Sequence, residues 1–237
     1  MTDADRRIVV VTRPEPGLAE TMAAVRRRGW EPMAAPMLSV RTLAAAVPRR
    51  VGAVLFTSGQ AIPGLAAHRA AIGDVPVLCV GNATARRAEA AGWRHVASAA
   101  GDAAALEALA SGTLQRDRGP LLLACGCGQG MALAAGLRAQ GFRVVRRCVY
   151  AATPARRLPD ALSAALEADQ VAAVLVFSAD TARAMTRCLP ERLHGRLAAI
   201  RCVAISGSAA SVLSALPWRE IAVAARPTAD AVLDRLG

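Results

Sequence analysis

The sequence predicts an α/β protein with doubly wound parallel sheets, and three observations support this prediction. Short apolar runs alternate with helix-like segments along the 237 residues, two parts of the chain repeat each other, and loops of small polar residues follow the apolar runs. The length suits one large domain or two small ones. The repetition favours two.

The apolar runs predict ten strands, each about five residues long. They cover residues 8–12, 31–35, 52–57, 76–80, 94–97, 120–124, 142–146, 172–177, 201–205 and 219–223. Strands that alternate with helices form parallel sheets, because each crossover between parallel strands needs a long connection. Two five-stranded sheets account for all ten runs.

The repetition indicates a tandem duplication. Residues 9–36 align with residues 121–148, which places Gly29 on Gly141 and Trp30 on Phe142. Each copy reads as a strand, a loop, a helix closed by a glycine, and a second strand.

A second pair of segments follows the first pair. VLFTSGQA from Val54 resembles LVFSADTA from Leu175, and VGNATARRAEAAGWRHVA from Val80 resembles ISGSAASVLSALPWREIA from Ile205. Repetition alone predicts two halves that meet near residue 115.

Six predicted strands run into loops of small residues that precede a helix. The loops are TRPEPG (12–17), TSGQA (57–61), GNATA (81–85), CGCGQG (125–130), SADTA (178–182) and SGSAA (206–210). Small polar residues are common N-caps, so simple capping explains any one loop. Six together favour a ligand with many carboxylates or phosphates, because helix N-termini attract anions and doubly wound sheets bind ligands beyond the carboxyl ends of their strands.

Composition argues against several classes of function. The formal charge of +11 comes from arginine alone, but the arginines are scattered and few aromatic residues lie between them, which argues against nucleic-acid binding. No apolar run reaches the roughly 18 residues that a membrane span needs, and the N-terminus lacks the pattern of a signal peptide. We therefore expect a cytoplasmic protein without a membrane partner.

The six cysteines form no CxxC pair, and we expect free thiols that are mostly buried. Cys125 and Cys127 form a CxC, but no neighbouring His or Cys completes a zinc site. We expect no metal.

Several motifs, taken in order, resemble the uroporphyrinogen-III synthase family. They are VTRP near the N-terminus, FTS at 56–58, VGNATA at 80–85, VY at 149–150 before a linker that contains proline, and AISGSAA at 204–210. The resemblance extends from about residue 8 to the C-terminus.

This resemblance implies two flavodoxin-like domains joined by a two-stranded linker. One domain is expected to be discontinuous, with residues 1–36 and 154–237, and the other to cover 41–147. The expected linkers are 37–40 and 148–153. We expect a monomer.

The resemblance also implies an activity, the conversion of hydroxymethylbilane to uroporphyrinogen III in heme biosynthesis. This linear tetrapyrrole with many carboxylates would be cyclised with loss of water and inversion of its last pyrrole ring. The bilane can also close unaided without inversion, so catalysis would consist mainly of positioning. No cofactor is expected.

Tyr150 is the only tyrosine of the chain. The resemblance implies that it corresponds to the tyrosine that takes part in the loss of water in this family. A phenol is protonated at neutral pH and can donate its proton to a departing hydroxyl. Alternatively, Tyr150 only packs at the domain junction, as amphipathic side chains do. The residues expected to bind substrate are Arg13, Thr57, Ser58, Gly59, Gly81, Asn82, Thr84, Gly126, Gly128, Ser178, Ser206, Gly207 and Ser208.

Three segments depart from the family pattern. Cys125 replaces an arginine that usually ends its strand, Ser208 and Ala209 replace a threonine pair, and Ser178 is followed by alanine where the first repeat has a second hydroxyl.

Two alternative functions stay open. One is an NADP-dependent oxidoreductase, because a strand, a Gly-rich loop and a helix cover residues 121–137, and Arg146 and Arg147 could accept a 2′-phosphate. Met131, however, stands where that fingerprint needs a small residue. The other is a two-lobed binding protein without catalysis, which would have no need of the phenol.

Overall fold

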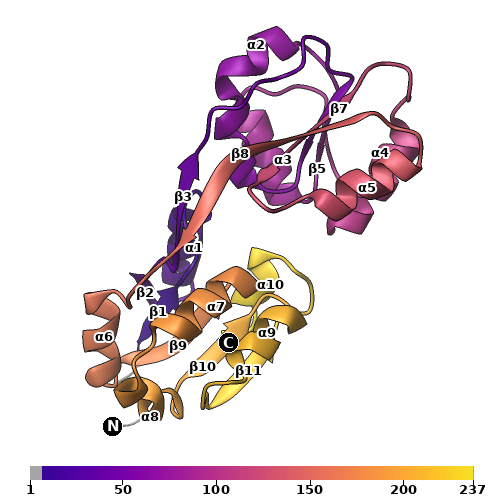
Figure 1. Cartoon of the computed structure of the whole chain (residues 1–237). Coiled ribbons are helices and arrows are strands. Elements are labelled where there is room, and N and C mark those ends of the chain that lie inside the picture. Colours follow the sequence, from indigo (N-terminus) through magenta and orange to yellow (C-terminus); the bar gives the residue numbers. More distant parts are fainter. Residues whose placement is uncertain (1–6, 237) are drawn as a thin grey trace. The chain divides into compact units, whose positions relative to one another are not determined.

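The computed structural model of the chain describes residues 7–236. These residues form two compact units (Figure 1). Unit 1 contains the chain up to Ser39 and again from Thr153, and unit 2 contains Val40–Ala152. The described part of the chain contains no helix that is long and apolar enough to cross a membrane.

Unit 1 is built on a five-stranded parallel sheet with the order β11-β10-β9-β1-β2. The strands are β1 (Ile8–Val11), β2 (Glu31–Ala34), β9 (Val171–Val176), β10 (Arg201–Ala204) and β11 (Glu220–Val223). Numbered along the chain within the unit, the order is 2-1-3-4-5, which is the flavodoxin-like order.

Helices cover both faces of this sheet. They are α1 (Gly17–Arg27), α6 (Asp160–Glu167), α7 (Ala179–Cys188), η4 (Glu191–Leu193), α8 (His194–Leu197), α9 (Gly207–Leu213) and α10 (Ala229–Leu233). Val10 packs in a core with α6, α7 and α9, whereas Val9 and Val11 pack in a second core with α1 and α10. β1 is therefore apolar at every position, because both of its faces are buried.

Unit 2 is built on a six-stranded sheet with the order β3-β8-β7-β4-β5-β6, in which the first residues of β3 and the last residues of β8 belong to unit 1. The strands are β3 (Leu38–Thr42), β4 (Ala53–Phe56), β5 (Val77–Cys79), β6 (Val96–Ser98), β7 (Leu121–Gly126) and β8 (Val144–Pro154). The pairs from β8 to β6 are parallel, and counting from β7 gives the order 2-1-3-4-5 again.

Helices also cover both faces of the second sheet. They are η2 (Gly59–Ala61), η3 (Pro63–His68), α2 (Arg69–Ile72), α3 (Asn82–Ala90), α4 (Ala103–Thr113) and α5 (Met131–Ala139). Val54 and Phe56 pack with η2, η3 and α3, and the alternate residues Ala53 and Leu55 pack with α4 and α5. The predicted fold class, an α/β protein with two doubly wound parallel sheets, is confirmed.

β3 and the second half of β8 form an antiparallel ribbon. The Leu43 N–H donates to the Val149 carbonyl and the Ala155 N–H donates to the Met37 carbonyl, both at 2.9 Å, so residue numbers rise on one strand as they fall on the other. β8 is one continuous strand of 11 residues. The predicted strand 142–146 is therefore too short, because the exposed residues near the end of β8 carry no apolar pattern.

The ten predicted strands all overlap observed ones, but β3 was not predicted as a strand, so the prediction of two five-stranded sheets is wrong for the second sheet, which has six strands. The repeat matches the topology. The alignment of residues 9–36 with 121–148 places β1 on β7, and the second pair of segments places β4 on β9. Each unit thus combines the first strand–helix–strand of one half with the last three strands of the other half.

The glycines that close the repeated helices behave as predicted. Gly29 and Gly141 have φ values of 83° and 89°, in the left-handed region that favours glycine. The next N–H groups, of Trp30 and Phe142, donate to carbonyls five residues back, which ends each helix in a Schellman turn.

Candidate functional site

The expected site residues form two sets, one at the carboxyl edge of each sheet. In unit 1 they follow β1, β9 and β10, which are neighbours in the sheet. In unit 2 most of them follow β7, β4 and β5, which are also neighbours. Parallel neighbours end at the same edge, so the loops of one unit lie together. All six loops run directly into helices, as predicted.

Arg13 follows β1 and is held by its surroundings. Its Nη1 donates to Thr21 Oγ1 at 3.3 Å, and its guanidinium lies 4.6 Å from the centre of the Phe177 ring. A Cβ on Gly17 would lie only 2.2 Å from Arg13 Cζ, so a larger residue at position 17 would displace the guanidinium. The guanidinium is thus fixed beside the ends of β1 and β9, where a ligand carboxylate could pair with it.

Ser178 and Ser206 are N-caps. Ser178 Oγ accepts from the Thr181 N–H at 3.0 Å, and Ser206 Oγ accepts from the Ala209 N–H at 3.4 Å. Gly207 and Ser208 are exposed at the start of α9. Capping therefore accounts for both serine hydroxyls, while other N–H groups of the first helical turns have no intrahelical partner.

Thr57 and Ser58 follow β4. Ser58 caps η2 by accepting from the Gln60 N–H at 3.3 Å, and Gly59 lies buried under the Arg87 side chain. Thr57 Oγ1 is a buried hydroxyl without a hydrogen-bond partner in the described part of the chain. A buried unsatisfied hydroxyl is costly, and a ligand group at this edge could satisfy it.

Three more expected residues lie at the start of α3. Gly81 is its N-cap, Asn82 is exposed in the first turn, and Thr84 is buried. Open space surrounds the position that a Cβ on Gly81 would occupy, and the same holds for Gly128 and Gly207. A ligand could approach the backbone closely at these three glycines.

Gly126 and Gly128 belong to the loop between β7 and α5, which we call the Gly-rich loop (residues 126–130). Gly126 pairs with Tyr150 of β8 across a register shift that follows Cys125. A Cβ on Gly126 would lie 2.8 Å from Tyr150 Cζ, so the tyrosine ring rests directly on the glycine. The register shift thus brings the phenol to the Gly-rich loop.

Tyr150 is buried, with 4% of its surface exposed. Its hydroxyl donates to Gln129 Oε1 at 2.9 Å, and its carbonyl accepts from the Cys127 N–H at 3.0 Å. The ring packs in the apolar core beside Val149. Sequence reasoning missed Gln129, and the only available signal was a long amide side chain among the glycines of CGCGQG.

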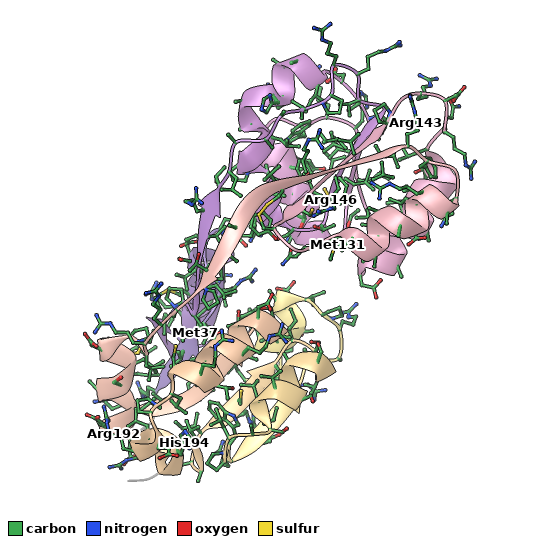
Figure 2. All side chains as sticks on the ribbon, in the orientation of Figure 1. Met37, Met131, Arg143, Arg146, Arg192 and His194 are labelled. Atoms are coloured by element: carbon green, nitrogen blue, oxygen red, sulfur yellow. A yellow bond between two sulfur atoms is a disulfide. The ribbon has the colours of Figure 1, made fainter. Side chains whose placement is uncertain are left out.

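A disulfide joins Cys127 of the Gly-rich loop to Cys148 of β8. It is the yellow sulfur–sulfur bond of Figure 2. The prediction of six free thiols is therefore wrong for these two residues. The two cysteines are 21 residues apart in sequence, and the pairing of β7 with β8 brings them together.

The other four cysteines are free, as predicted. Burial, and then the charge of Glu89, raise the pKa of the Cys79 thiol to about 12. Burial also raises the pKa values of Cys202 and Cys188. Cys125 is buried, and its thiol donates to the Gln129 carbonyl at 3.3 Å.

The arginines of the alternative nucleotide site already bind protein carbonyls. Arg146 Nη1 donates to the Gln129 carbonyl at 2.9 Å, and Arg147 Nε donates to the Ala46 carbonyl at 2.6 Å. Met131, at the start of α5, is 62% exposed (Figure 2). A dinucleotide loop needs a small residue there for close contact between helix and strand, so the fingerprint is not formed.

Comparison with known proteins decides between these functions. A family model described as uroporphyrinogen-III synthase HemD matches residues 19–234, nearly the whole chain. The chain belongs to the uroporphyrinogen-III synthase family. Enzymes of this family are cyclising lyases of tetrapyrrole biosynthesis, and their substrate is a small tetrapyrrole. The resemblance, the expected enzyme class and the main expected function are confirmed.

Solved structures of uroporphyrinogen-III synthases share the fold. The enzyme of Helicobacter pylori 26695 is 15% identical, with 98% of each chain covered and a TM-score of 0.61. A mutant enzyme from the extremely thermophilic bacterium Thermus thermophilus is 19% identical, with 97% of each chain covered and a TM-score of 0.53. No protein of curated function matches the sequence significantly.

Proposed function

We propose that the chain converts hydroxymethylbilane to uroporphyrinogen III, and that the two sets of strand-end loops bind the carboxylates of this substrate. The observation that carries the proposal is the same in both units. Three neighbouring parallel strands end in small-residue loops that begin helices, so backbone N–H groups and positive helix ends gather at one edge of each sheet.

Within these sets we assign roles by chemistry. Arg13 pairs with a substrate carboxylate, and Thr57 Oγ1, which has no hydrogen-bond partner among residues 7–236, donates a hydrogen bond to the substrate. Backbone N–H groups bind further carboxylates at the loops. These loops contain Ser58, Gly59, Gly81, Asn82, Thr84, Gly126, Gly128, Ser178, Ser206, Gly207 and Ser208.

Catalysis is then mainly a problem of selection. Loss of the terminal hydroxyl as water leaves an azafulvene, and the last pyrrole ring attacks it through a substituted carbon. The resulting spiro intermediate fragments and recloses with that ring inverted. Binding the flexible bilane by its carboxylates brings the disfavoured carbon to the electrophile, and such positioning can supply several kcal/mol of the barrier.

We assign the donation of a proton to the departing hydroxyl to Tyr150. A neutral phenol performs this step without placing charge among the substrate carboxylates. In the free protein its hydrogen bond goes to Gln129, so the substrate must take the place of that acceptor. We further propose that the enzyme is a cytoplasmic monomer that binds neither nucleic acid nor membranes.

The decisive experiment is incubation with freshly generated hydroxymethylbilane, followed by oxidation and chromatographic separation of the type I and type III isomers. The protein should raise the share of type III above that of a buffer control. An isomer ratio equal to that of buffer contradicts the proposal.

Tyr150→Phe tests the proton donor in the same assay. Loss of a general acid lowers kcat by roughly 10²-fold or more. The variant keeps the ring on Gly126, so circular dichroism should match that of the wild type. Near-normal turnover would remove Tyr150 from the mechanism and leave the assignment of the loops intact.

A further inference from the structure

Gln129 is the direct partner of the candidate proton donor. The residue is exposed on the Gly-rich loop, but its side-chain Oε1 reaches the buried Tyr150 hydroxyl at 2.9 Å. Its backbone is held on both sides, since its N–H donates to the Gly126 carbonyl at 3.0 Å and its carbonyl accepts from Arg146 Nη1 at 2.9 Å. The amide therefore extends from a fixed backbone to cover the phenol oxygen.

The loop and the tyrosine strand are also tied to each other. The disulfide links Cys127 to Cys148, and the Cys127 N–H donates to the Tyr150 carbonyl. The ring of Tyr150 rests on Gly126. A covalent link, a backbone hydrogen bond and a steric contact thus fix where the hydroxyl lies relative to Gln129.

We infer that Gln129 is a positioning residue, whose carboxamide oxygen holds the Tyr150 hydroxyl at the Gly-rich loop until the hydroxyl of the substrate replaces it. This inference rests on the proposed role of Tyr150. A neutral amide accepts a hydrogen bond without removing the proton, so the phenol stays ready to donate. A carboxylate at this position would accept the same bond but would repel a polyanionic substrate.

Two variants of Gln129 test its oxygen acceptor and its lack of charge, and a third variant serves as a control. Gln129→Met keeps the length of the side chain and removes the oxygen acceptor. Gln129→Glu keeps an oxygen acceptor and adds a negative charge. Gln170→Met makes the same chemical change at an exposed residue of unit 1, for which the described part of the chain shows only backbone hydrogen bonds, and serves as the control.

A spectroscopic test needs no activity. Because Tyr150 is the only tyrosine, labelling with 13Cζ-tyrosine gives one NMR signal from the phenol carbon. We expect Gln129→Met to shift this signal, and Gln170→Met to leave it in place. Gln129→Glu should keep the hydrogen bond and lower affinity, seen as a raised KM. An unmoved signal in Gln129→Met would overturn the inference.

A double-mutant cycle tests whether Gln129 acts through Tyr150. Gln129→Met should lower kcat roughly 10-fold, as expected when a reacting group is misplaced. In the Tyr150→Phe background the same change should have no further effect. An equal loss in both backgrounds would show a merely structural role and overturn the inference.

The two proposals fail in different ways. If Tyr150→Phe keeps normal turnover, the proton donor is wrong, and the inference about Gln129 falls with it even when the NMR signal shifts. If Tyr150→Phe is inactive and Gln129→Met keeps the wild-type kcat, the donor stands and only the inference about Gln129 is overturned.

Discussion

Gly126 sets how closely the Tyr150 ring approaches the end of β7. A Cβ at position 126 would lie 2.8 Å from both Tyr150 Cζ and Gln129 Oε1, closer than real Cβ contacts. We expect Gly126→Ala to displace the ring and to lower the free energy of unfolding by about 1–3 kcal/mol, the usual cost of overpacking. Urea unfolding measures this loss.

Gly112→Ala provides the matched control. Gly112 is exposed near the end of α4, and open space surrounds the position that its Cβ would occupy. The free energy of unfolding should stay unchanged or rise by up to about 1 kcal/mol, because alanine favours the helix. Equal stabilities of the two variants would contradict the contact between Gly126 and Tyr150.

The thiols give a second prediction. In denaturant, iodoacetamide should modify four cysteines without reductant and all six after reduction, as mass spectrometry can count. In the native protein Cys79 and Cys202 should stay unmodified at pH 8, because burial raises the pKa values of both thiols. Six modified cysteines without reductant would contradict the disulfide.

Because the pKa of Cys79 is raised in the folded protein, the free energy of unfolding also depends on pH. In the folded protein this thiol stays protonated up to about pH 12, whereas it ionises near 9.0 when unfolded. The unfolded state thus binds fewer protons between these values, so the free energy of unfolding falls as pH rises through this window.

At the scale of residues, the sequence singles out Tyr150 as a candidate but does not show its partners. A single tyrosine in a chain with few aromatic residues is conspicuous in the sequence alone. Gln129 and the disulfide depend on a register shift between β7 and β8 that brings Gly126 opposite Tyr150. No local pattern encodes such a shift, because it arises from the packing of two strands.

At the scale of elements, two helix caps can be compared to separate a structural role from a role in substrate binding. Ser178 accepts from the third N–H of α7 at 3.0 Å, and Thr228 accepts from the third N–H of α10 at 3.2 Å. Replacing either residue with alanine should lower the free energy of unfolding by about 1 kcal/mol. Thermal unfolding of both variants measures these losses.

Only Ser178 belongs to the expected site, and α10 follows β11, outside the three loops of unit 1. We therefore expect a raised KM for hydroxymethylbilane in Ser178→Ala and an unchanged KM in Thr228→Ala. The same KM in both variants would reduce Ser178 to a helix cap.

Strands buried on both faces were predictable, and β8 was only partly so. Val9, Val10 and Val11 give a continuous apolar signal, because two cores bury them in turn. Residues 151–154 of β8 are exposed or half-buried, and their backbone pairing with β3 keeps them extended. Backbone pairing leaves no trace in hydropathy.

The whole molecule is assembled from exchanged halves. Repetition located the equivalent strands but not their partners, because β1 and β7 are equivalent and either could pair with β4. The chain crosses between the units through the ribbon of β3 and β8, and this path places β7, rather than β1, beside β4. Sequence alignment of the repeats cannot show this path.

This topology predicts that unit 2 folds alone. Met37 and Ala155 are joined by a backbone hydrogen bond of 2.9 Å, so a fragment of residues 37–155 begins and ends at neighbouring positions. We expect this fragment to unfold cooperatively in urea, to keep the disulfide, and to lack cyclising activity because the loops of unit 1 are missing. A fragment without a cooperative transition would contradict the division into units.

The exchange of halves also fixes the order in which a ribosome delivers the pieces. β1 leaves the exit tunnel early, but its neighbour β9 begins 160 residues after Val11. At about 5–20 residues per second, β1 waits roughly 8 to 30 seconds for that neighbour. During translation unit 2 is completed first, while β1 still exposes the apolar edge that later pairs with β9, and such an unpaired edge favours aggregation.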